Sequence, residues 1–136
     1  MSILIRCIYS NLIMKLLVNN KTINISLLDT KTAHIISKSK EFSSLISTWG
    51  DEIYFKTPIK GIKLEENARD TMFFGEIAYW VEGNSIAIGF GITPASINEE
   101  IRLVSKVNIW AKFDTKDNDI NFFKSIKDDT IIKFIN

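Results

Sequence analysis

Three short stretches rich in aromatic and branched aliphatic residues, separated by glycines, restrict what this chain can fold into. They cover residues 49–55, 75–80 and 86–94. Residues of these types favour β-strands, and glycine marks the bulges, bends and loops between strands. Consecutive short strands of this kind predict a small barrel or sandwich rather than a helical fold.

Alternation of apolar and polar residues extends the β pattern to both ends of the chain. Residues 14–18 and 22–27 flank the pair Asn19-Asn20. Because asparagine tolerates a positive φ, this pair predicts a tight hairpin turn. Apolar strands at both ends would aggregate if they were left unpaired, which favours a closed barrel over an open sheet. Further strands are predicted over residues 42–48, 51–57, 76–81, 85–90, 107–113 and 130–135.

Only short helices are expected between the strands. One covers residues 32–40, with Asp29 or Thr30 as its N-cap, and another begins at Asp119. Two polar segments complete the interpretation: a surface loop or single helical turn at residues 65–71, and a helical segment capped by Asn98 at residues 98–103.

The size and charge of the chain limit the classes of function. A chain of 136 residues fits one domain, and a chain of this length buries enough surface to need no disulfide or metal for its core. Seventeen basic residues stand against sixteen acidic ones. A nucleic-acid-binding protein usually carries a clear basic excess or stripe, so no nucleic-acid partner is expected.

Cys7 is the only cysteine and His34 the only histidine. A single cysteine cannot form an internal disulfide, so the sequence favours the cytoplasm over an oxidising compartment. A single histidine rules out a histidine-rich metal centre. Cys7 lies in an apolar leader and His34 on a predicted helix, which disfavours a catalytic thiol–imidazole pair. We therefore expect no metal and no cofactor.

Residues 1–13 form the apolar leader, which Arg6 interrupts. No basic segment precedes the apolar run, no small-residue cleavage site follows it, and it is too short to span a bilayer. The alternatives are an additional strand or an extension ahead of a second candidate start, Met14. Clean alternation begins only after Met14, which favours the extension. The folded domain is therefore assigned to residues 14–136, and no membrane partner is expected.

Four segments stand out in order along the chain: Trp49-Gly50-Asp51-Glu52-Ile53-Tyr54-Phe55, Gly75-Glu76-Ile77-Ala78-Tyr79-Trp80, Ile88-Gly89-Phe90-Gly91-Ile92-Thr93-Pro94 and Val107-Asn108. Together they resemble the small prokaryotic cyclophilin-like proteins of uncharacterised function. The similarity extends over about residues 14–136. It implies an all-β fold, a closed eight-stranded cyclophilin-like barrel with two short helices.

The resemblance does not extend to the catalytic site of the cyclophilins, which are peptidyl-prolyl isomerases. Those enzymes use an arginine beside phenylalanine, glutamine and histidine on the barrel face. This chain has no glutamine, Arg69 and Arg102 lie outside the matching strand, and Arg6 lies in the leader. Lys56 is nearest in sequence, but a flexible ammonium does not reproduce a planar guanidinium. An isomerase-like enzyme is therefore a disfavoured alternative.

Period-two alternation assigns the aromatic residues to faces of the sheet. Glu52 and Tyr54 share one face, which would place a hydrogen-bond acceptor beside an aromatic wall, whereas Asp51 points the other way. Tyr79 and Trp80 point in opposite directions, so one belongs to the core and the other to the surface or to a pocket rim.

These residues define a candidate ligand site without a catalytic constellation. We expect it to bind a small molecule or an extended peptide. Gly89 and Gly91 do not form a phosphate-binding loop, because no helix follows them. The candidate ligand-binding residues are Trp49, Glu52, Tyr54, Tyr79, Trp80, Phe90 and Pro94.

A structural or assembly role as a homodimer is an alternative from a different class of function. It is motivated by the apolar leader and by Trp110. Trp110 alternates in phase with Asn108 and Lys112, so it is predicted to be partly exposed.

Overall fold

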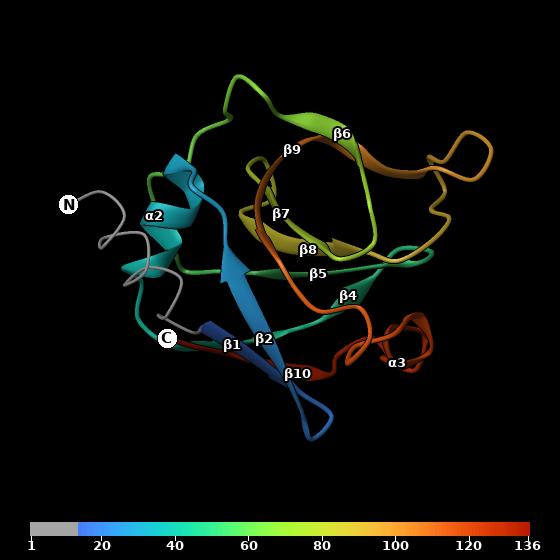
Figure 1. The fold of residues 1–136 in the computed structure, drawn as a ribbon, viewed down its shortest axis with the longest axis horizontal. Coiled ribbons are helices and arrows are strands. Elements are labelled where there is room, and N and C mark those ends of the chain that lie inside the picture. Colours follow the sequence, from blue (N-terminus) through green and yellow to red (C-terminus); the bar gives the residue numbers. More distant parts are fainter. Residues whose placement is uncertain (1–13) are drawn as a thin grey trace.

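The computed structural model describes residues 14–136, which fold into strands wrapped around a single interior with two short helices at its periphery (Figure 1). The expectation for the leader, including Cys7, concerns residues outside this described part. The elements are β1 (Met14–Val18), β2 (Lys21–Leu27), α2 (Lys31–Ser37), β3 (Phe42–Leu45), β4 (Ser47–Thr48), β5 (Glu52–Lys56), β6 (Arg69–Met72), β7 (Glu76–Trp80), β8 (Ser85–Gly89), β9 (Ile101–Lys112), α3 (Ile120–Lys124) and β10 (Ile131–Ile135).

One bent segment closes the barrel. Residues 42–48, predicted as a single strand, divide at Ile46 into β3 and β4. Because β3 pairs with β10 and β4 pairs with β5, this segment joins the two ends of the strand order β3-β10-β1-β2-β9-β7-β8-β5-β4. With β3 and β4 counted as one strand, that order has the eight strands predicted from the sequence, and β6 lies outside it, paired with β9. The all-β barrel with two short helices is confirmed.

Local sequence signals fix the turns and caps. Asn19 and Asn20 join β1 to β2 with φ values of 49° and 62°, the left-handed conformation expected of this pair. Of the two candidate caps of α2, the Thr30 side chain accepts the hydrogen bond from the Ala33 N–H. Asp119 caps α3 in the same way, as predicted.

Two segments were predicted wrongly. Residues 65–71 include the start of a strand, β6, and residues 98–103 are not helical. Asn98 has a φ of 58°, which no helical N-cap adopts, and β9 begins three residues later at Ile101. Both errors have one cause, since β6 and the first half of β9 pair with each other and this long-range pairing overrides local propensity.

The prediction that Trp110 is partly exposed was also wrong, because its side chain is 0% exposed. The register between β7 and β9 shifts at this point: Ile77 pairs with Ala111, but Ala78 pairs with Ile109. Trp110 is therefore the extra residue of a β-bulge, which breaks the alternation. It packs in the main core, whereas Ile109 packs on the opposite side of the sheet. Trp110 thus offers no exposed surface for the dimer contact that its predicted exposure had motivated.

The apolar residues form two clusters on opposite faces of β7 and β8. Tyr79 and Ile86 belong to the main cluster inside the barrel, whereas Ala78 and Ala87 belong to a smaller cluster outside it. The outer cluster lies beneath β6 and the first half of β9, which run along the outer side of the barrel in Figure 1. Its buried members are Met72, Ala78, Ala87, Leu103 and Val107.

Replacement of Trp110 by alanine tests the bulge. A buried tryptophan leaves a large cavity, so we expect Trp110→Ala to lower the free energy of unfolding by about 3–5 kcal/mol. An exposed position would change it by only about 0.5 kcal/mol. Trp110→Phe should cost less than alanine, because the indole N–H has no hydrogen-bond partner among residues 14–136. Urea denaturation measures both, with Ile131→Ala at a 66% exposed position as the control. A loss near the control's value would contradict the burial of Trp110.

Candidate ligand-binding site

A pocket of about 180 Å³ lies between β5, the end of β7 and the first half of β9, on the outer face of the barrel. Three of its seven lining residues are aromatic, three are aliphatic and one is a carboxylate. Its lining residues are Trp49, Glu52, Tyr54, Trp80, Leu103, Val104 and Val107.

Small residues on the outer face of the sheet make room for the segments that cover it. Ala78 pairs with Ala87 across β7 and β8, and Gly89 pairs with Glu52 across β8 and β5. A Cβ atom on Gly89 would lie 2.4 Å from the Ile101 side chain. The glycine therefore permits β9 to approach this face closely, directly beside Glu52.

An irregularity in β9 supplies the aliphatic side of the pocket. On β6, Arg69 pairs with Val107 and Thr71 pairs with Arg102. Residues 103–106 of β9 therefore bulge opposite a single residue of β6. This bulge carries two of the aliphatic lining residues and the serine that holds Trp80.

Trp80 is fixed on several sides. Its indole Nε1 donates a hydrogen bond to Ser105 Oγ at 2.9 Å, and its ring meets the Tyr54 ring edge-on, with centroids 5.9 Å apart and an interplanar angle of 89°. A Cβ atom on Gly83 would lie 2.1 Å from the Trp80 ring, so the ring rests against the β7–β8 hairpin. The two aromatic walls are thus held at a right angle by contacts within the chain.

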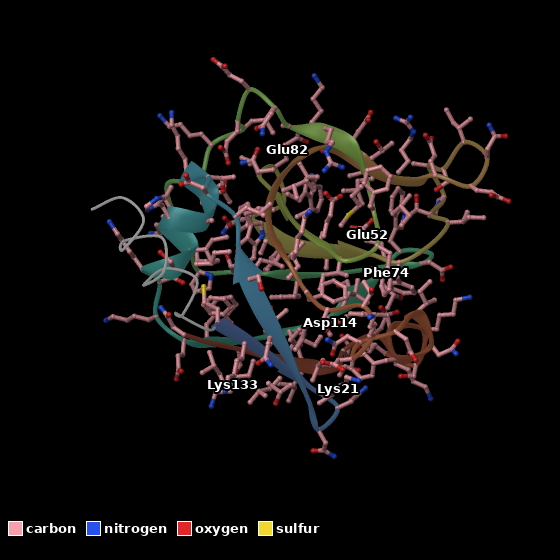
Figure 2. The ribbon with its side chains drawn as sticks, in the orientation of Figure 1. Lys21, Glu52, Phe74, Glu82, Asp114 and Lys133 are labelled. Carbon is pink, nitrogen blue, oxygen red and sulfur yellow. The ribbon has the colours of Figure 1, made fainter. Side chains whose placement is uncertain are left out.

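Glu52 is the unusual residue of the pocket. Glu52 is 7% exposed, and its Oε1 atom has no hydrogen-bond partner among residues 14–136. Figure 2 labels it within the packed side chains beside the sheet. Burial raises the pKa of Glu52 from 4.5 to about 7. Near neutral pH the carboxyl therefore exists both as an acceptor and, once protonated, as a donor.

Glu76 lies on the same outer face but has its partners. Its residue is 8% exposed, and its carboxylate accepts hydrogen bonds from Arg69 Nη1 at 3.0 Å, from Arg69 Nη2 at 2.5 Å and from the Phe73 N–H at 2.7 Å. Burial alone would raise the pKa of Glu76, but the Arg69 and Phe73 hydrogen bonds and the Arg69 charge hold it below 4.5. Glu76 therefore forms a structural ion pair with Arg69, whereas Glu52 forms no ion pair within residues 14–136.

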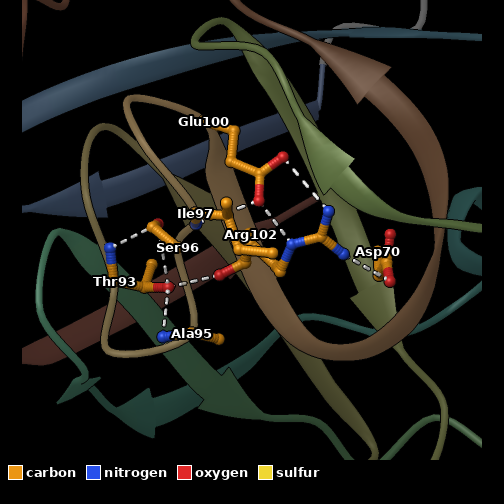
Figure 3. Close-up of polar contacts among 7 residues, drawn as sticks. All are labelled: Asp70, Thr93, Ala95, Ser96, Ile97, Glu100 and Arg102. Carbon is orange, nitrogen blue, oxygen red and sulfur yellow. Dashed lines mark hydrogen bonds and ion pairs between the residues drawn. The ribbon is translucent and has the colours of Figure 1, made fainter.

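Arg102 anchors the first half of β9 to its surroundings (Figure 3). It donates to both oxygens of Glu100 and to Asp70 of β6, and Thr93 Oγ1 donates to its backbone carbonyl. Glu100 also accepts the Ile97 N–H. This network fixes the loop before β9 against β6, and it engages the Arg102 guanidinium with two carboxylates.

The structure brings four of the seven predicted site residues together, and these are Trp49, Glu52, Tyr54 and Trp80. Leu103, Val104 and Val107 were not among the predicted site residues. The helix predicted over residues 98–103 includes Leu103, and the alternation predicted for residues 107–113 assigns the strand of Val107 to the wrong faces. The available signal was the adjacent apolar pair Leu103-Val104, which becomes a pocket wall only once β9 is known to bulge.

The other three predicted residues lie elsewhere. Tyr79 is fully buried in the main core, where its hydroxyl bonds to Thr57 and Asn84. Phe90 stacks on Phe123 in the same core, with centroids 5.7 Å apart. Pro94 is exposed and lies against Gly50, where its Cδ would be 3.0 Å from an added Cβ. None of the three lines the pocket.

A second, larger hollow of about 600 Å³ lies between α2 and residues 61–67. Its inward polar groups already bond one another: Thr32 Oγ1 donates to Glu65 at 2.5 Å, and Asn108 donates to Thr32 and accepts the Glu65 N–H. These contacts tie α2 and residues 61–67 to β9. The inward polar groups of this hollow therefore already have hydrogen-bond partners and stabilise the fold.

Within residues 14–136, no three histidine, cysteine, aspartate or glutamate side chains gather closely enough to hold a metal ion. In the same residues, no helix combines the length and apolar character needed to cross a membrane.

The raised pKa of Glu52 predicts a specific dependence of stability on pH. Between pH 4.5 and about 7 the folded protein keeps a proton that the unfolded chain has released, so stability from this group is present at low pH and is lost as pH rises through about 7. Glu52→Gln removes the buried charge. We expect it to stabilise the protein near pH 8 by on the order of 1–3 kcal/mol and to have a smaller effect near pH 5. Chemical denaturation at both pH values measures this.

The matched control is Glu82→Gln, in the exposed β7–β8 hairpin (Figure 2). It should leave stability nearly unchanged at both pH values. An effect of Glu52→Gln that did not depend on pH would contradict the uncompensated burial of this carboxylate.

Comparison with known proteins agrees with the barrel. The sequence matches the cyclophilin-like family over residues 13–134. Among solved structures, the chain is similar to the solution structure of a hypothetical protein from Archaeoglobus fulgidus, with 27% sequence identity, a TM-score of 0.72, and coverage of 90% of this chain and 92% of that chain. A search of curated proteins found no significant match. Since the family match spans nearly all of the described barrel, this protein belongs to the cyclophilin-like family.

Proposed function

We propose that this domain binds a small molecule, or a side chain of an extended peptide, in the pocket that contains Glu52. The observation that supports the proposal is a buried carboxylate with an unpartnered oxygen at the wall of an aromatic pocket. Burying a polar group without a partner costs free energy, so such groups in folded proteins call for an explanation. A ligand that donates a hydrogen bond to Glu52 supplies the missing partner.

The size of the pocket limits the ligand. A volume of about 180 Å³ lies below the ~300–1,000 Å³ typical of sites for drug-sized molecules. The pocket therefore suits a compact molecule or one branched or cyclic group of a larger one. The right angle between the Tyr54 and Trp80 rings allows the ligand to contact two aromatic faces at once.

A ligand panel followed by thermal shift tests this proposal. A ligand present at about 100 times its dissociation constant should add about 2.7 kcal/mol of stability. Val104→Trp, a change at a 62% exposed position on the pocket rim, should fill the opening and abolish the shift. Ile131→Trp, which adds the same side chain at an exposed position on β10, should keep it. If no ligand class raised the midpoint, or if Val104→Trp left the shift intact, this binding function would be wrong.

Peptidyl-prolyl isomerase activity is not expected, because the arginines within residues 14–136 that could donate hydrogen bonds to a substrate are already paired with carboxylates. Both arginines of the described residues are engaged, Arg69 with Glu76 and Arg102 with Glu100 and Asp70. Isomerisation must lower a barrier of ~18–20 kcal/mol, and this requires donors placed on the twisted peptide.

We therefore expect no acceleration over the uncatalysed rate in a proline-containing peptide assay. A rate enhancement that disappeared in Arg102→Ala or Lys56→Ala would show that another donor had been recruited and would overturn this expectation. A true cyclophilin assayed in parallel serves as the positive control.

A further inference from the structure

The pocket combines aromatic walls with an acidic group, and none of its lining residues within 14–136 is basic. Trp49 directly follows β4, Tyr54 lies on β5 and Trp80 on β7, and Glu52 lines the pocket with them. The remaining lining residues are aliphatic. Aromatic rings attract cations through their negative faces, and sets of such rings recognise alkylated ammonium groups.

The buried carboxylate of Glu52 indicates the sign of the charge on the ligand. Glu76 on the same face has an arginine within the chain at 2.5 Å, whereas no lysine or arginine of the described part of the chain lines the Glu52 pocket. An anionic ligand would place a second negative charge in a buried setting that already lacks a counter-charge. A cationic ligand would supply that counter-charge.

We propose that the pocket binds a substituted ammonium group, with an N–H of the ligand donated to the Glu52 carboxylate and its alkyl groups packed against Trp49, Tyr54 and Trp80. This assignment rests on the proposed binding function and specifies the chemical class of its ligand. A tertiary ammonium fits best, since it retains one proton to donate and carries three alkyl groups for the rings. A secondary ammonium with two N–H groups belongs to the same class, whereas a quaternary ammonium has the charge but no N–H.

The compact volume and the fixed rings support this chemistry. A bare ammonium is strongly hydrated, and the aromatic and aliphatic walls of the pocket offer few acceptors to replace that water. Alkyl substitution lowers the number of N–H groups that need partners and adds apolar surface that the rings can contact. The side chains that define the walls are already held in place, so little order has to be gained on binding.

Matched amine and carbon compounds test the assignment on the full chain. The probes are N,N-dimethylethanolamine, choline, and the neutral compounds 3-methylbutan-1-ol and 3,3-dimethylbutan-1-ol, in which carbon replaces nitrogen. We expect N,N-dimethylethanolamine to bind most tightly, choline more weakly, and the neutral compounds at least about tenfold more weakly than the amine of the same shape, measured by NMR titration or calorimetry.

The variants separate the charge from the shape of the site. Glu52→Gln should weaken amine binding by at least about tenfold and leave the binding of the neutral compounds unchanged. Trp80→Leu should weaken both, and Glu82→Gln should weaken neither. Circular dichroism of each variant establishes that it is folded, and Trp80→Leu provides an independent readout if Glu52→Gln does not fold.

The source of the ammonium group is distinguished by a further pair of probes. A short peptide that carries dimethyllysine, compared with its leucine counterpart, tests a peptide side chain, and N,N-dimethylethanolamine tests a free amine. Tighter binding of the peptide would identify a modified side chain as the occupant, and tighter binding of the free amine would identify a small molecule. Either result supports the ammonium assignment.

Four outcomes would overturn it. Equal binding of amines and their carbon counterparts, or amine binding that Glu52→Gln leaves intact, would refute the ammonium assignment and leave the binding function standing. Binding only of neutral or anionic members of the wider panel would do the same. Failure of every ligand class would refute both.

Discussion

The interior and the pocket of this barrel both depend on the places where β9 departs from regular pairing. The first departure, at Trp110, places the largest side chain of the strand in the main core and leaves Ile109 on the outside. The second, at residues 103–106, moves the strand away from β6 and forms one wall of the pocket. A β-bulge adds a residue to one strand only, so it changes which face each later residue occupies. One strand can thereby serve the barrel interior at one end and an outer layer at the other.

The segments that resemble the family supply five of the seven residues that line the pocket, and they also hold the scaffold together. Asp51 donates its N–H to the Ile92 carbonyl, and its own carbonyl accepts the Phe90 N–H, so two of the segments bond each other. Gly50, with a φ of 60°, lies where a Cβ would be 2.9 Å from the Ile92 carbonyl oxygen. Asn108, from a third segment, ties β9 to α2. These contacts explain why a resemblance based on short segments predicted the fold and did not by itself define a function.

Much of the site could be predicted because strand periodicity is a local property. Two-residue spacing placed Glu52 and Tyr54 on one face and separated Tyr79 from Trp80, and the structure has both arrangements. Bulges are set by pairing between distant strands, which alternation along one strand does not reveal. For this reason the exposure of Trp110 and the strand at residues 101–103 were predicted wrongly. The aliphatic wall of the pocket was missed with them.

Two buried carboxylates on one face of the sheet, Glu76 and Glu52, differ in whether the fold supplies their hydrogen-bond donors. Glu76 is surrounded by the donors that a buried charge needs, and those donors belong to the elements that it holds together. Glu52 has comparable burial without a cationic partner among residues 14–136, and desolvation raises its pKa to about 7. An apolar residue or a glutamine at this position would spare the fold that penalty, because an unpaired buried charge is destabilising whereas a well-packed neutral side chain is not. The requirements of the barrel therefore account for Glu76 but not for Glu52, and Glu52 is the group whose hydrogen bonding the proposed ligand would complete.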